Sequence, residues 1–156
     1  MMKLLRFSAK VRKMTDSFLE GKTGFEDLIL KYLHEEQLNA KLLPVHEFIE
    51  MKLRTVDRII LFFLFDMLLD WRTGTSFNRD IKPLLGKLKN PIAEFEAFTD
   101  CEGKLFDKLL IQLSYNENYD DYYVELTNDC LLTFLYQDQY PFKNTLKADI
   151  HFFSVN

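Results

Sequence analysis

The chain has 156 residues, the usual size of one domain, and we expect residues 1–156 to form a single globular domain. Its apolar fraction of 47% and charged fraction of 28% are ordinary for a folded protein, and fifteen phenylalanines supply material for a large core. Five glycines and four prolines exclude extended low-complexity linkers.

The first half of the chain predicts three helices. Apolar residues recur at helical spacing over residues 4–19, and Gly21 supplies a stop, although residues 3–11 also fit a strand. A second helix, over residues 23–39, opens on the capping-box sequence TGFE, whose threonine is the expected cap. A third helix over residues 44–71 has a proline in its first turn, and its stretch RIILFFLFDMLLDW is expected to be the most buried part of the molecule.

The second half predicts shorter elements. Residues 72–79 are rich in threonine, glycine, serine and asparagine, which predicts a loop. Asn90 and Pro91 form a strong helix start, and the ending ADIHFFSVN fits a strand or an extended tail. The helices expected here cover residues 84–88, 91 to about 100–103, 104–113 and 126–135, the last with Asn128 as its cap.

These elements predict a mainly α fold, a single compact multi-helix domain of about five to seven helices with minor strands near the C-terminus. The alternative is an α+β fold. In that case KLLRFSAKV, YYVEL and DIHFFSVN would be strands.

Several locations and chemistries lack support in the sequence. The run IILFFLF is far shorter than the about twenty apolar residues of a membrane-spanning helix, so we expect no membrane association. The first residues lack the continuous apolar run of an export signal. We therefore expect a cytoplasmic protein, with Cys101 and Cys130 as reduced, buried thiols.

Catalytic and metal-binding patterns are incomplete. The sequence HEFIE lacks the second histidine of a metalloprotease helix, and GKTG lacks the upstream glycine of a phosphate loop. No Gly-x-Ser-x-Gly elbow is present. We expect no metal, no cofactor and no catalytic residue. An enzyme with an unrecognised site in a helical pocket, built on Asp66 and Asp70 or on the histidines, is one alternative.

Charge is unevenly distributed along the chain. Residues 91–139 carry eleven carboxylates against two lysines, Lys104 and Lys108. Such a region repels phosphates, so we expect no nucleic acid there, and it attracts basic partners. The N-terminus is basic and is expected to be a solvated face or to pair with the acidic half; its cations are Lys3, Arg6, Lys10, Arg12 and Lys13.

The segment YNENYDDYYVE, residues 115–125, holds four tyrosines and four carboxylates. Tyrosine offers a wide contact area with few rotatable bonds, and neighbouring carboxylates steer a basic partner during encounter. The alternative is an ordinary loop in which two of the rings pack on the core and the acids are solvated. The candidate partner-binding residues are Glu117, Tyr119, Asp120, Asp121, Tyr122, Tyr123, Glu125 and Asp129.

The leading hypothesis is therefore a small protein-binding protein of the cell interior. In size, acidity and lack of catalytic motifs the chain resembles bacterial immunity and antitoxin proteins. A nuclease toxin needs a basic surface to hold nucleic acid, and an acidic, tyrosine-rich surface complements it. A further alternative is a structural or regulatory homo-oligomer, in which the basic N-terminal helix meets the acidic half of a second copy.

Overall fold

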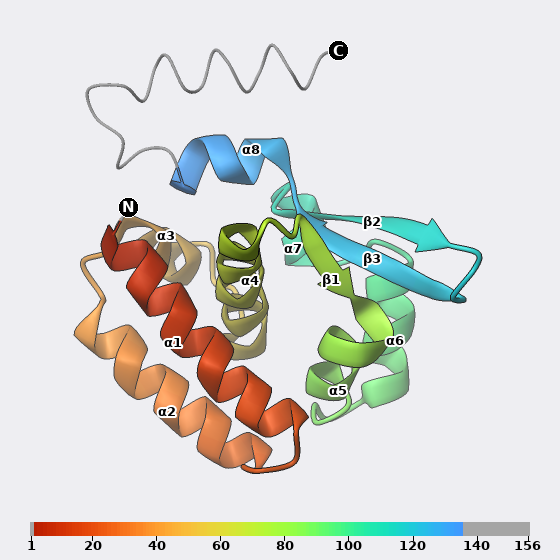
Figure 1. Ribbon diagram of the computed structural model, residues 1–156, viewed down its shortest axis with the longest axis horizontal. Coiled ribbons are helices and arrows are strands. Elements are labelled where there is room, and N and C mark those ends of the chain that lie inside the picture. The colour runs from red at the N-terminus through yellow and green to blue at the C-terminus, as the bar shows by residue number, and fades with distance from the viewer. Residues whose placement is uncertain (1, 136–156) are drawn as a thin grey trace.

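A computed structural model describes residues 2–135 of the protein, and it confirms a mainly α fold with minor strands (Figure 1). The expected C-terminal strand ADIHFFSVN lies outside the described residues. The helices are α1 (Met2–Leu19), α2 (Phe25–Leu38), α3 (Leu43–Glu50), α4 (Thr55–Met67), α5 (Lys82–Leu85), α6 (Pro91–Thr99), α7 (Lys104–Asp107) and α8 (Asn128–Cys130). The strands are β1 (Gly74–Ser76), β2 (Ile111–Asn116) and β3 (Asp121–Leu126). Short 3-10 or π turns cover Leu68–Asp70, Phe77–Ile81 and Leu131–Leu135.

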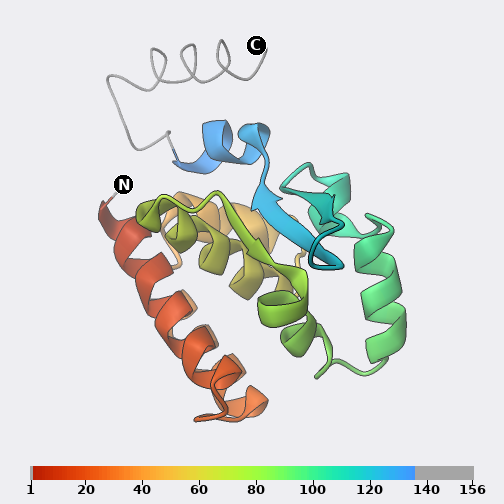
Figure 2. The same cartoon turned by 45° about the vertical axis from the view of Figure 1, so that its right-hand side comes forward.

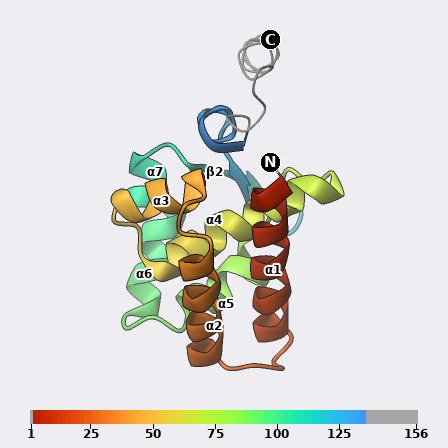
Figure 3. The same ribbon diagram turned by 90° about the vertical axis from the view of Figure 1, so that its left-hand side faces the viewer.

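Helix α4 forms the centre of the core. Every residue from Ile59 to Met67 is buried, because α1 and α2 pack on one side of α4 and strands β1 and β3 contact another. Figure 3 shows α1 and α2 side by side, with α4 behind them. The stretch predicted to be the most buried is therefore the core helix, although its last residues, Asp70 and Trp71, are exposed.

The expected single helix over residues 44–71 is wrong, because the structure divides it into α3 and α4. Lys52 adopts a left-handed conformation with a φ of 59°, which ends α3. The carboxylate of Asp57 then accepts the backbone N–H of Arg54 at 3.2 Å and satisfies a donor at the start of α4. Met51 and Leu53 still pack inward, so the apolar pattern runs through the break without marking it.

The expected helix over residues 104–113 is also wrong. Helix α7 ends at Asp107, and Leu109 takes a left-handed φ of 56°. From there Ile111 is buried, Gln112 exposed and Leu113 half-buried, which is the period-two pattern of a strand. The alternative reading of YYVEL as a strand is confirmed by β3, whereas residues 3–11 belong to helix α1.

Two expected helix caps differ from those in the structure. Helix α2 begins at Phe25 after Gly24, so Thr23 does not cap it. The cap of α8 is Thr127 and not Asn128, since the hydroxyl of Thr127 accepts the backbone N–H of Cys130 at 3.1 Å. Both differences move a helix start by one residue, within the usual uncertainty of such boundaries.

The sheet has the order β1-β3-β2, and both pairs are antiparallel. Strand β1 comes from the segment 72–79 that was expected to be a loop, and it pairs Thr75 with Val124. The central strand β3 buries Val124 and Leu126 against the helices. The sheet thus joins the middle of the chain to the tyrosine-rich segment.

Gly74 permits the close approach of β1 to β3. A Cβ atom at Gly74 would lie 2.1 Å from the carbonyl oxygen of Val124 and 2.8 Å from the Cβ of Glu125. We expect Gly74→Ala to separate the strands and to lower the free energy of unfolding by about 1–3 kcal/mol, as overpacking does. Urea unfolding measures this loss. Gly24→Ala is the control, because a Cβ there meets nothing within 4 Å, and it should cost less than about 1 kcal/mol.

Candidate functional site: the tyrosine-rich hairpin

The tyrosine-rich segment forms most of a β-hairpin. Strands β2 and β3 meet at a turn over residues 117–120, on the side of the molecule away from α1 and α2 (Figures 1 and 2). The backbone carbonyl of Asn116 accepts a hydrogen bond from the N–H of Tyr119 at 3.3 Å, and the side-chain oxygen of Asn116 accepts one from the N–H of Asn118 at 3.0 Å. Asp120 closes the turn at a φ of 46°, a conformation that aspartate tolerates better than most residues.

The four tyrosines of the hairpin have different environments. Tyr119 is 78% exposed and Tyr115 is 53% exposed, so both rings are presented to solvent. Tyr122 packs inward, with its ring centroid 6.2 Å from that of Phe77. Tyr123 is half-buried, and its hydroxyl lies 3.1 Å from the hydroxyl of Thr73. Among the predicted tyrosine anchors, Tyr119 therefore has the geometry of one, whereas Tyr122 contributes to the fold.

The carboxylates of the turn are also exposed. Glu117 and Asp120 lie in solvent, and the hydroxyl of Tyr115 donates a hydrogen bond to Asp120. This hydrogen bond raises the pKa of Tyr115. Asp129 is exposed in the first turn of α8. Two predicted acids of β3, in contrast, are held within the fold.

Asp121 and Glu125 are those two acids. Asp121 accepts hydrogen bonds from the hydroxyl of Ser76 and from the backbone N–H of Asn78, the latter at 3.0 Å. Glu125 accepts a hydrogen bond from the side-chain amide of Gln112 at 2.8 Å. Across residues 2–135, no lysine or arginine forms an ion pair with any of the predicted carboxylates of the site.

A hollow of about 520 Å³ lies beside the hairpin. Arg72 and Arg79 line it together with Tyr119, Asp121 and Tyr123. The guanidinium of Arg79 binds the buried carboxylate of Asp80 at 3.1 Å, which raises the pKa of Arg79, and the charge of Asp121 adds to this effect. The hollow therefore has mixed charge, and the purely acidic surface is the turn.

Asp66 and Asp70, the carboxylate pair considered for catalysis, both bind Arg12. Its Nη1 atom lies 3.3 Å from Asp66 and 2.5 Å from Asp70. Burial raises the pKa of Asp66, and the hydrogen bond from Arg12 opposes that rise. These contacts connect α1 to α4 and to the turn Leu68–Asp70 that follows it, which gives these acids a structural role.

The histidines and cysteines among residues 2–135 show no convergent site, and His151 lies outside the described residues. His46 lies 3.9 Å from Glu50, and both side chains are exposed. No group of three or more metal-binding side chains occurs in the described part of the chain. Cys130 is buried, and burial raises its pKa, which disfavours the thiolate. Cys101 is exposed, so its expected burial is wrong.

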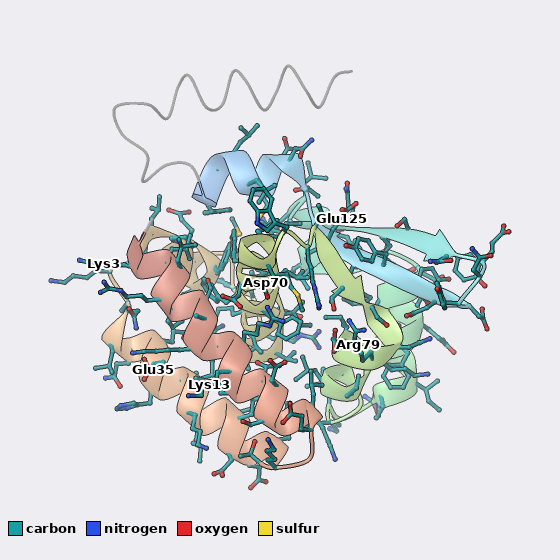
Figure 4. All side chains as sticks on the ribbon, in the orientation of Figure 1. Lys3, Lys13, Glu35, Asp70, Arg79 and Glu125 are labelled. Carbon is teal, nitrogen blue, oxygen red and sulfur yellow. The ribbon has the colours of Figure 1, made fainter. Side chains whose placement is uncertain are left out.

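The basic N-terminal residues lie along α1, at a distance from the hairpin. Figure 4 shows Lys3 and Lys13 on the α1 side of the molecule and Glu125 on the sheet side. Lys10 forms an ion pair with Glu35 at 3.5 Å. The acidic hairpin is therefore not neutralised by these cations. No helix among residues 2–135 is both long and apolar enough to cross a bilayer.

Two features of this site were missed in the sequence. Tyr115 belongs to the exposed surface, and Arg72 and Arg79 line the adjacent hollow. The alternation of IQLSY places Tyr115 on the same face as Ile111 and Leu113, so it gave no signal for the exposure of Tyr115. No local pattern brings residues 72–79 next to the hairpin. The chain matches no protein-family model, no curated protein and no solved structure.

Proposed function

We propose that the protein binds a basic protein partner through the turn of the β2–β3 hairpin. The observation that carries this proposal is the exposure, on one turn, of a large aromatic ring, Tyr119, between the carboxylates of Glu117 and Asp120. A tyrosine anchor beside acids that form no ion pair within residues 2–135 combines contact area with electrostatic steering. The rigid ladder below the turn limits the entropy lost on binding.

The kind of partner follows from the charge and from the class of protein that the chain resembles. An acidic, aromatic projection fits a cationic groove, such as the surface that a nuclease uses to hold phosphates. The protein would then act as an inhibitor of the immunity or antitoxin type, which blocks that groove within the cytoplasm. Candidate contacts beyond the turn are the outer face of β3, at Tyr123 and Glu125, and the exposed Asp129.

The test begins with capture of the partner from cells that produce the protein. Tyr119→Ala and Asp120→Lys should each lose a basic protein that the wild type retains. Ile92→Ala and Glu26→Lys are matched controls, because both residues are exposed and lie on helices outside the hairpin. The same partner should lose its activity when titrated with one equivalent of the wild-type protein.

Binding kinetics separate the contribution of the carboxylates from that of the tyrosine anchor. Asp120→Lys should slow association about tenfold at low salt, with a smaller effect at high salt, because steering is screened. Tyr119→Ala should act on dissociation, since an anchor that fills a pocket slows release. A captured protein that is acidic, or one whose binding is equal for both variants and both controls, contradicts the proposal.

A further inference from the structure

Within residues 2–135, the backbone groups on the outer edge of strand β2 face no other strand. The sheet order β1-β3-β2 leaves one side of β2 without a neighbouring strand among the described residues (Figure 1). The N–H of Thr127 donates to the carbonyl of Leu110 at 3.0 Å, which identifies that pair as a hydrogen-bonded one. Because such pairs alternate in an antiparallel ladder, the residues whose N–H and C=O groups face outward are Ile111, Leu113 and Tyr115.

This edge lacks the features that usually protect an edge strand. Its sequence IQLSYN contains no charged residue and no proline, and it pairs with β3 in an unbroken register over six residues. Strand β1, at the opposite edge, has only three residues. Leu109 is 58% exposed just before β2, and Tyr115 is exposed within it. An uncharged edge with apolar neighbours is suited to pairing with another strand.

The charges that flank β2 identify the strand that fits. Lys104 and Lys108 precede β2, and Asp107 between them leaves that end with a net charge of +1. Glu117 and Asp120 follow β2 and make the other end negative. Antiparallel pairing of two copies about Leu113 places the lysine end of each strand against the acidic end of the other. A partner strand that is basic throughout would be repelled at the lysine end.

We propose that two copies of the chain associate through β2, related by a two-fold axis at Leu113, to form a continuous six-stranded antiparallel sheet. In this register Ile111 of one copy lies opposite Tyr115 of the other, and the end of β2 that follows Lys108 lies against the end of the second copy's β2 that precedes Glu117. The dimer goes beyond the proposed function and does not depend on it, because it forms through the edge of the sheet and needs only a second copy of the chain.

Charge reversal tests this register in the full chain by analytical ultracentrifugation. The wild type should be a dimer. Lys108→Glu and Glu117→Lys should each raise the dissociation constant about tenfold, since each places like charges together at both ends of the shared edge. The Lys108→Glu/Glu117→Lys double variant should restore the dissociation constant of the wild type. Both side chains are exposed, so the fold is retained. Lys87→Glu, at an exposed lysine between α5 and α6, is the control for net charge.

Hydrogen exchange provides a second readout at single residues. The amides of Ile111, Leu113 and Tyr115 should become protected as the protein concentration rises. Those of Gln112 and Ser114, which already bond to β3, should change little. A protein that stays monomeric at every concentration overturns the proposal. A dimer indifferent to both charge reversals, or edge amides protected independently of concentration, overturns it as well, because another surface or another segment of the same chain then forms the contact.

Discussion

Replacing Phe62 by alanine is expected to lower the free energy of unfolding by about 3–5 kcal/mol, the usual cost of removing a buried ring. Phe62 has no exposed surface, and it lies at the centre of an aromatic cluster on α4. Its ring centroid is 4.7 Å from that of Phe7 on α1 and 5.4 Å from that of Phe48 on α3. Three helices therefore lose contact area together, and urea unfolding followed by far-ultraviolet circular dichroism measures the loss.

Two further substitutions calibrate the effect of Phe62→Ala. Phe62→Leu retains much of the volume and should cost clearly less than the alanine variant. Leu30→Ala removes a side chain that is 66% exposed on α2, and its effect should stay within about 0.5 kcal/mol. If Phe62→Ala costs no more than Leu30→Ala, the cluster on α4 does not hold α1 and α3 to the core.

The helical core was predictable because its signal is repeated many times. Every turn of α1 and α4 adds an apolar residue to the same pattern, so single exceptions do not disturb it. The break between α3 and α4 depends on one left-handed residue, Lys52. Lysine has no special preference for that conformation, and the apolar residues on either side of it continue to pack inward.

The strands were harder to predict because each is short and gains its stability from partners distant in sequence. Strand β1 has three residues, and it pairs with residues about fifty positions later. The composition of residues 72–79 is that of a loop, and only the pairing with β3 makes it a strand. Strand β2 showed an alternating pattern, but the helical spacing of Leu105, Phe106 and Leu109 just before it concealed the change of period.

The candidate site was predictable in composition but not in geometry. Tyrosines and acids in one segment predicted a contact surface, which stays a prediction, and the structure shows that the exposed residues of this segment lie on the turn and at Tyr115 on β2. Sequence could not separate Tyr119 from Tyr122, because it did not show that Tyr119 lies in the turn whereas Tyr122 lies in β3 and packs against Phe77. Nor could it show that the carboxylate of Asp121 accepts hydrogen bonds from Ser76 and Asn78, since these residues lie more than forty positions away in the sequence.

Arg58→Ala is expected to destabilise the protein by about 3–5 kcal/mol, because it leaves a buried carboxylate without its partner. The Nε atom of Arg58 lies 2.7 Å from Oε2 of Glu36, its Nη2 atom lies 3.0 Å from Oε1, and its Nη1 atom donates to the carbonyl of Leu53. The two side chains are only 11% and 9% exposed, so water replaces little of the lost interaction. Urea unfolding at neutral pH measures the effect.

The destabilisation caused by the unpaired carboxylate of Glu36 can be separated from the destabilisation caused by lost packing. The Arg58→Met/Glu36→Leu double variant removes both charges and should be clearly more stable than Arg58→Ala. Lys10→Ala breaks a pair whose lysine is largely exposed, and it should cost no more than about 1 kcal/mol. A double variant that is no more stable than Arg58→Ala would mean that lost side-chain contacts, and not the unpaired charge of Glu36, account for the destabilisation.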